Sequence, residues 1–154
     1  MTVHSDSKPL RLVRTVRQED SHGCGVACAA MIAGITYQDA RKTFADLGYG
    51  VTRKSKQPFS SNFTELMAAL REHGIGCTIK RWRGWEQLDS LGILKVDNGC
   101  KNSWHWVVAM PHPDLRVVIH DPCLVSEILM DAPPKVDGTR FGDFRPYGNW
   151  IRIS

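Results

Sequence analysis

A cysteine between two glycines, at the start of a run of small and apolar residues, is the residue best suited to chemistry. Cys24 is flanked by Gly23 and Gly25, and the residues that follow favour a helix. A thiol in the first turn of a helix meets the partial positive charge of the N–H groups there, which favours the nucleophilic thiolate. Gln18 precedes it by a short loop and is expected to aim its amide N–H at an oxyanion formed during attack. Taken alone, the pattern also fits a small-residue helix with a buried thiol.

A thiol nucleophile needs a base beside it and a third group that orients the base. Two short strands joined by a turn-prone link, residues 104–121, are predicted to form an antiparallel hairpin. If Met110 pairs with Arg116, His105 lies directly opposite Asp121. Opposed residues have Cβ atoms about 5 Å apart, which lets an imidazole N–H reach a carboxylate. The hairpin is therefore expected to build a His–Asp pair; the alternative is a surface histidine and a turn aspartate.

The same register places the neighbours of this pair. Val107 and Ile119 share its face and form an apolar strip that is expected to face the helices. Trp104 and Trp106 flank His105 and are expected on the opposite face, where packing is their simplest role.

The other histidines are weaker candidates for the base. His22 is close to Cys24 but lies on its loop, and His112 is in the predicted turn. His120 faces away from His105, and His4 and His73 have no evident partner. Two further tryptophans lie beside basic residues and are expected to make surface or partner contacts: Trp82 and Trp85.

The first half of the chain has the periodicity and capping residues of helices. They are predicted at Cys24–Ala33 before Gly34, at Gln38–Leu47 after Thr36, and at Phe63–His73 after Ser61 or Asn62. From there on the pattern is that of strands. These are predicted at Cys77–Trp82, Ile93–Val96, Trp104–Met110, Arg116–Asp121 and Asn149–Ile153, with a short helix at Glu86–Leu91 and further strands at Leu10–Val16 and Ser126–Met130. This order indicates an α+β fold, with an N-terminal helical half packed on a C-terminal antiparallel sheet.

The size and composition are those of one soluble globular domain. It is predicted to span residues 1–154, with a loose segment over residues 1–9. No apolar run reaches membrane-spanning length and the N-terminus lacks the apolar centre of a signal peptide, so we expect a cytoplasmic protein without a membrane segment. The net charge of +4 is too small to indicate nucleic-acid binding.

Cysteine usage argues against a disulfide or metal framework. The five cysteines, Cys24, Cys28, Cys77, Cys100 and Cys123, are odd in number and irregularly spaced. Cys24 and Cys28 have no second short-spaced pair that would complete a zinc site. We therefore expect no metal and no cofactor.

Three motifs resemble the bacteriocin-processing, double-glycine-leader peptidases of bacteria, which are papain-like cysteine peptidases usually found as the N-terminal domain of an ABC exporter. The motifs are Gln18-x-Asp20-x-x-x-Cys24-Gly25-x-Ala27-Cys28, His105-Trp106-Val107-Val108 and Val118-Ile119-His120-Asp121-Pro122. The resemblance spans Val16 to Pro122. It implies a papain-like fold, with Cys24 as nucleophile, His105 as general base and acid, Asp121 as the orienting carboxylate and Gln18 as the oxyanion donor. It also implies a peptide or protein substrate with glycine before the cut.

Two departures from this family are visible. Gly23 stands where the family usually has an acidic residue. No transmembrane or nucleotide-binding segment follows, so we expect a free-standing peptidase domain. The same Cys-His-Asp site also suits an effector-like deamidase, isopeptidase or acyl transferase, and the fold alone suits a non-catalytic peptide-binding domain. The oligomeric state is left open.

Overall fold

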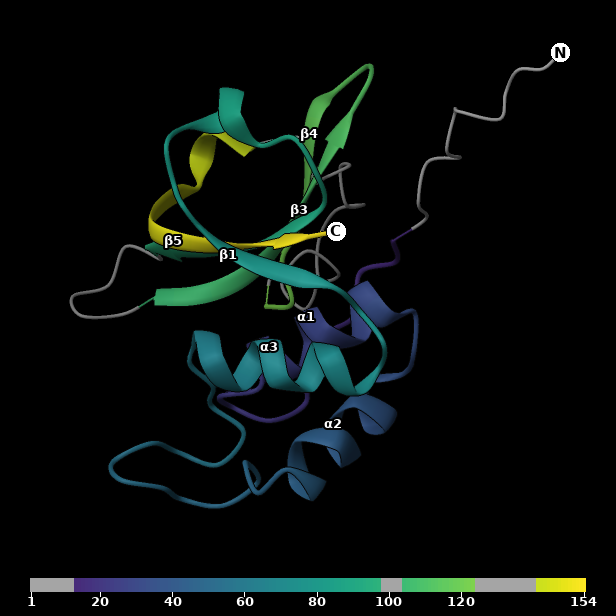
Figure 1. Ribbon diagram of the computed structural model, residues 1–154, viewed down its shortest axis with the longest axis vertical. Coiled ribbons are helices and arrows are strands. Elements are labelled where there is room, and N and C mark those ends of the chain that lie inside the picture. The colour runs from purple at the N-terminus through teal and green to yellow at the C-terminus, as the bar shows by residue number, and fades with distance from the viewer. Residues whose placement is uncertain (1–12, 98–103, 124–140) are drawn as a thin grey trace, which may run out of the picture.

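The computed structural model describes residues 13–97, 104–123 and 141–154. Within them, three helices lie on one face of a five-stranded antiparallel sheet (Figure 1). The helices are α1 (Cys24–Ala33), α2 (Tyr37–Asp46) and α3 (Phe63–Glu72). The strands are β1 (Cys77–Arg81), β2 (Gly92–Asp97), β3 (Trp104–His112), β4 (Arg116–His120) and β5 (Arg145–Ile153), in the order β1-β5-β2-β3-β4. The predicted α+β fold is confirmed. No helix in these segments is long and apolar enough to cross a bilayer.

The helix ends follow from their capping residues. Gly34 ends α1 in the left-handed conformation that glycine adopts without strain. The Thr36 side chain accepts the N–H of Asp39 and begins α2. Of the two residues predicted to cap α3, Asn62 does so, in a capping box with Glu65.

Three predicted elements differ from the structure. Val13 and Val16 pack against the helical core and are not in a strand, while residues 10–12 and 126–130 lie outside the described segments. The predicted helix at Glu86–Leu91 is a single turn, η2 (Trp85–Gln87). β5 starts four residues earlier than predicted, because Gly148 (φ 73°) lies at an irregularity in the β2–β5 pairing and does not end the strand.

The predicted register of the hairpin is wrong by two residues. Met110 pairs with Val118 and not with Arg116, because β3 continues to His112. The Nδ1 of His112 accepts backbone N–H groups of two turn residues at 3.1 Å, which shortens the turn to residues 113–115. Arg116, the first residue of β4 after this turn, has a left-handed backbone (φ 73°).

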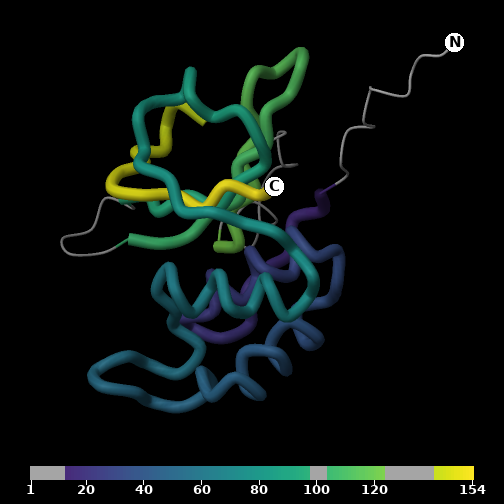
Figure 2. Tube along the Cα trace, in the orientation of Figure 1, coloured from purple at the N-terminus to yellow at the C-terminus, as the bar shows by residue number. Residues whose placement is uncertain are grey.

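The sheet buries apolar side chains on both faces. Trp106 and Val108 belong to the cluster that packs against the helices. Trp106 packs in a core as expected, but on the helix side of the sheet and not on the side away from the helices. Val107 and Ile119 belong to a second cluster on the opposite face, so the prediction that they face the helices is wrong. The chain between β1 and β2 arches over this far face and meets the segment before β5 (Figure 2).

This arch also corrects the role of two tryptophans. Trp82 and Trp85, expected at the surface or against a partner, are half-buried and pack against the cluster on the far face. Their rings stack edge to face 5.0 Å apart, and they contact Trp150 and Phe141 over the sheet. They therefore close the second core.

A polar brace holds the loop that leads into α1. The Asp20 carboxylate accepts hydrogen bonds from Tyr37 Oη (2.7 Å) and from Arg41 Nε (2.9 Å), both on α2. Burial alone would raise the pKa of Asp20, but these hydrogen bonds outweigh it and lower the pKa below its ordinary value of 3.8. The Asp20 carbonyl in turn accepts the N–H of Gly23 at 3.0 Å, which shapes the turn directly before Cys24.

The same brace explains the glycine before the cysteine. A Cβ at Gly23 would lie only 2.0 Å from the Tyr37 hydroxyl oxygen. The space that a side chain would need at this position is thus filled from α2.

We predict that Gly23→Ala destabilises the protein by about 1–3 kcal/mol, as expected for overpacking, and that Tyr37→Phe in the same chain restores part of the loss. Urea unfolding of the single and double variants measures both effects. Gly142→Ala is the matched control, because a Cβ there meets nothing within 4 Å. A Gly23→Ala protein as stable as the wild type would contradict the steric explanation.

We predict that Asp20→Asn lowers the free energy of unfolding by about 1 kcal/mol at pH 7, a value reduced for the partial exposure of Arg41. Because folding lowers the pKa of Asp20, its contribution is complete above the ordinary pKa near 3.8 and is lost as the pH falls through the folded value. Unfolding curves from pH 7 to pH 3 should therefore converge for variant and wild type. A gap that stays constant over this range would exclude the charged brace.

Candidate active site

Cys24 is the first residue of α1 and is partly exposed. The helix begins close to β3 because Gly25 has no side chain. A Cβ at this position would lie 2.4 Å from Ser61 Oγ and 3.2 Å from Trp106 Cδ1. Gly25 therefore lets the start of α1, and with it the thiol, pack against the strand that carries His105.

Burial is the largest influence on the Cys24 thiol and raises its pKa above that of an ordinary cysteine. The negative charge of Asp121 raises it further. Hydrogen bonds from the backbone N–H groups of Trp106 and Gly25 act in the opposite direction without offsetting burial. The helix start thus favours the thiolate as expected, but the net direction is toward a neutral thiol. Such a thiol needs a base to take its proton.

His105 and Asp121 are in contact. The Nε2 of His105 lies 3.2 Å from Oδ2 of Asp121, and only 15% and 8% of the two side chains are exposed. The register pairs Val108 with His120, and its continuation places Asp121 opposite Val107. His105 lies two residues before Val107, so its contact with Asp121 is diagonal across the two strands. A shift of two residues keeps both side chains on the same face, so the wrong register still led to the right pair.

The contact with Asp121 also assigns the two nitrogens of the imidazole. Since Nε2 faces the carboxylate, Nδ1 is the nitrogen that remains to exchange a proton. The Trp106 N–H that bonds the Cys24 sulfur belongs to the residue directly after His105. Cys24 and the His105–Asp121 pair thus both lie near the start of β3, beyond the last paired residue of β4.

Gln18 is held by the loop before α1 and by the turn after β4. Its Nε2 donates to the carbonyls of Asp20 (3.0 Å) and Ser21 (3.2 Å), and its Oε1 accepts the thiol of Cys123 (2.9 Å). Its backbone N–H donates to the carbonyl of Pro122 at 3.4 Å. The amide is therefore ordered, and to serve as an oxyanion donor it must exchange a loop carbonyl for the oxyanion.

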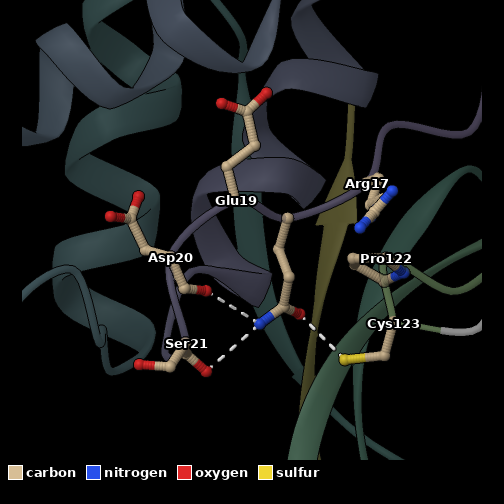
Figure 3. Close-up of a pocket in the computed structure, with 7 residues that line it drawn as sticks. Arg17, Glu19, Asp20, Ser21, Pro122 and Cys123 are labelled. Atoms are coloured by element: carbon tan, nitrogen blue, oxygen red, sulfur yellow. Dashed lines mark hydrogen bonds between the residues drawn. The ribbon is translucent and has the colours of Figure 1, made fainter. Parts of the chain in front are cut away.

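A cavity of about 370 Å³ opens beside Gln18. Its lining comes from two segments, residues 17–21 and residues 122–123 (Figure 3). The cavity keeps the amide of Gln18 and the thiol of Cys123 accessible from solvent.

Two contributors to the site were not predicted from the sequence. The influence of the Trp106 N–H on Cys24 was missed because the predicted pairing of β3 with β4 extended past this residue, whereas the observed pairing ends at Val108. Cys123 was counted only as one of five cysteines; its position two residues after Asp121 was the available signal, because its N–H bonds Asp121 Oδ1 at 2.9 Å.

The other described histidines have structural contacts. His120 Nδ1 lies 2.6 Å from Thr15 Oγ1, and burial lowers the pKa of this imidazole. His73, for which no partner was expected, lies 2.8 Å from Thr43 Oγ1. His22 has only a 3.5 Å contact with Ser21.

Comparison with known proteins identifies the fold. No family model and no curated protein matches the sequence. The structure is similar to that of a double glycine motif protease from an AMS/PCAT transporter in complex with the leader peptide, with a TM-score of 0.61 and 18% identity over 96% of this chain and 94% of that chain. It is also similar to the peptidase domain of Streptococcus ComA, a bi-functional ABC transporter involved in a quorum sensing pathway (TM-score 0.61, 18% identity, 93% and 98% covered). The same domain from Streptococcus mutans with a small-molecule inhibitor gives a TM-score of 0.55 at 18% identity, with 92% and 98% covered. The chain thus has the papain-like fold of double-glycine peptidase domains.

Proposed function

We propose that the protein is a cysteine peptidase that hydrolyses a peptide bond through a thioester acyl-enzyme. The observation that carries this proposal is the contact between His105 and Asp121, whose side chains are both mostly buried. His105 lies next to Trp106 in β3, and the backbone N–H of Trp106 favours the thiolate of Cys24. A nucleophile, a base and a group that orients the base are the parts that acyl transfer requires.

The proposed reaction begins with transfer of the Cys24 proton to His105 Nδ1. The thiolate attacks the carbonyl carbon, and the new C–S bond leaves a tetrahedral oxyanion that accepts hydrogen bonds from the Gln18 amide and the Cys24 backbone N–H. His105 then donates its proton to the leaving nitrogen, and the C–N bond breaks to give a thioester and a free amine. Water attacks the thioester while His105 takes its proton, which releases the carboxylic acid and restores the thiol.

Asp121 has two roles in this scheme. Through Oδ2 it holds the imidazole with Nδ1 toward the thiol, and its charge stabilises the imidazolium that forms. It also raises the pKa of Cys24, which disfavours a thiolate without an imidazolium beside it. The carboxylate thus links deprotonation of the thiol to protonation of His105.

The substrate is proposed from the fold neighbours. One of them was crystallised with a leader peptide, which supports a peptide or protein substrate here, with glycine before the cut as the preference to test first. Deamidation, isopeptide cleavage and acyl transfer use the same groups. Analysis of the products separates them, because only peptidase action adds water across a backbone peptide bond of a linear chain.

We predict that a library of peptides with a thiol-reactive electrophile at the C-terminus labels the wild type at Cys24 and fails to label Cys24→Ala. Asp121→Asn should slow labelling by about 10²-fold or more, since general-base catalysis contributes about 10²–10⁴. Mass spectrometry locates the adduct and gives the preferred residue before the cut. Cys77→Ala is the matched control and should be labelled normally. Equal labelling of Asp121→Asn and wild type would argue for a binding domain without turnover.

We predict that His105→Ala shifts alkylation of Cys24 by iodoacetamide to high pH. Without the imidazole, burial and the charge of Asp121 leave a raised pKa, so the rate should rise only above about 8.5, the value of a free thiol. At pH 7 the variant should react at least about tenfold more slowly than the wild type. The His22→Ala control tests the histidine nearest in sequence. If His22→Ala alters the pH profile and His105→Ala does not, the assignment of His105 as the base is wrong.

A further inference from the structure

We infer that Cys123 is a positioning residue that sets the orientation of the Gln18 amide for the oxyanion. The inference rests on the proposed peptidase function and concerns a residue outside the Cys-His-Asp site. It starts from the short turn after β4, where Asp121, Pro122 and Cys123 all contact either the catalytic pair or Gln18.

Cys123 joins the orienting carboxylate to Gln18 through two bonds. Its N–H donates to Oδ1 of Asp121 at 2.9 Å, while Oδ2 of the same carboxylate faces His105. Its thiol donates to Oε1 of Gln18 at 2.9 Å. The two sides of the carboxylate thus hold the imidazole and, through Cys123, the glutamine side chain.

The thiol supports the orientation in which the amide nitrogen of Gln18 points toward the loop of Cys24. An amide has a donor end and an acceptor end, and the loop offers two carbonyls, of Asp20 and Ser21, which accept only from Nε2. A donor on the other side, the Cys123 thiol, fixes Oε1 there. Both sides favour the same orientation, and a flipped amide would place oxygen against oxygen on the loop.

The same contact serves as the pivot during the reaction. The Gln18 Nε2 must leave a neutral loop carbonyl for a charged oxyanion, which is the stronger acceptor. The Oε1–thiol bond does not compete with this step, so it can persist while the nitrogen turns. A side chain that retains a donor at position 123 therefore keeps the oxyanion group in place.

The test is a mutant cycle on the peptide substrate found with the probe library. Cys123→Ala should lower kcat about tenfold with KM nearly unchanged, a fraction of the factor of about 10²–10³ that loss of a whole oxyanion donor produces. Cys123→Ser keeps a donor and should retain most of the activity. In a Gln18→Ala background, Cys123→Ala should have no further effect, because the residue through which it acts is gone.

A second readout does not depend on turnover. The two side-chain N–H signals of Gln18 should stay well separated in NMR spectra of the wild type and Cys123→Ser, and approach each other in Cys123→Ala. Cys123 is exposed, so Cys123→Ala is expected to fold, which circular dichroism checks.

The outcomes separate the two proposals. An inactive wild type with the expected change in the amide signals would remove the peptidase function and leave the orientation of Gln18 by Cys123 standing. Unchanged amide signals in Cys123→Ala would overturn the positioning role whatever the activity. An equal loss of kcat in Cys123→Ala and Cys123→Ser, or an undiminished effect in the Gln18→Ala background, would also overturn it.

Discussion

The close approach of α1 to β3 is the contact on which the rest of the site depends. Gly25 lies against Trp106 and Ser61 with no room for a Cβ, and the Trp106 N–H reaches the Cys24 sulfur from the same strand. A larger residue at position 25 would separate the helix start from the strand and place the thiol out of reach of that N–H. The helical half and the sheet are thus joined at the point where the chemistry is proposed, and Trp106, which is fully buried, stabilises both.

Asp121 organises the second side of the site. One carboxylate oxygen faces His105 and the other accepts the N–H of Cys123, so a single side chain orients the proposed base and closes the turn that contacts Gln18. Low exposure strengthens these hydrogen bonds, and the same low exposure raises the pKa of the Cys24 thiol. Burial therefore has two effects at this site. It strengthens the contact between His105 and Asp121, and it favours the protonated form of the Cys24 thiol. In the proposed mechanism, this makes proton transfer to His105 part of catalysis.

The sequence by itself determined the helices and the identity of the residues that meet. The end of α1 at Gly34 and the caps Thr36 and Asn62 are local features, because each depends on hydrogen bonds within one turn. Strand alternation predicted that His105 and Trp106 lie on opposite faces of the sheet. This prediction does not depend on the register, so it survives an error of two residues. For the same reason, the contact between His105 and Asp121 could be predicted although the pairing of Met110 with Arg116 was wrong.

Only the tertiary structure decided the register, the covering of the sheet and the second ring of contacts. The turn side chain of His112 set the hairpin length, and the arch between β1 and β2 covered the face of Val107 and Ile119. The hydroxyl of Tyr37, from a different helix, fills the space beside Gly23. The bond from Cys123 to Gln18 joins residues 105 positions apart. Such features depend on where separate segments meet, and the hydrophobic pattern of each segment holds no information about that distance.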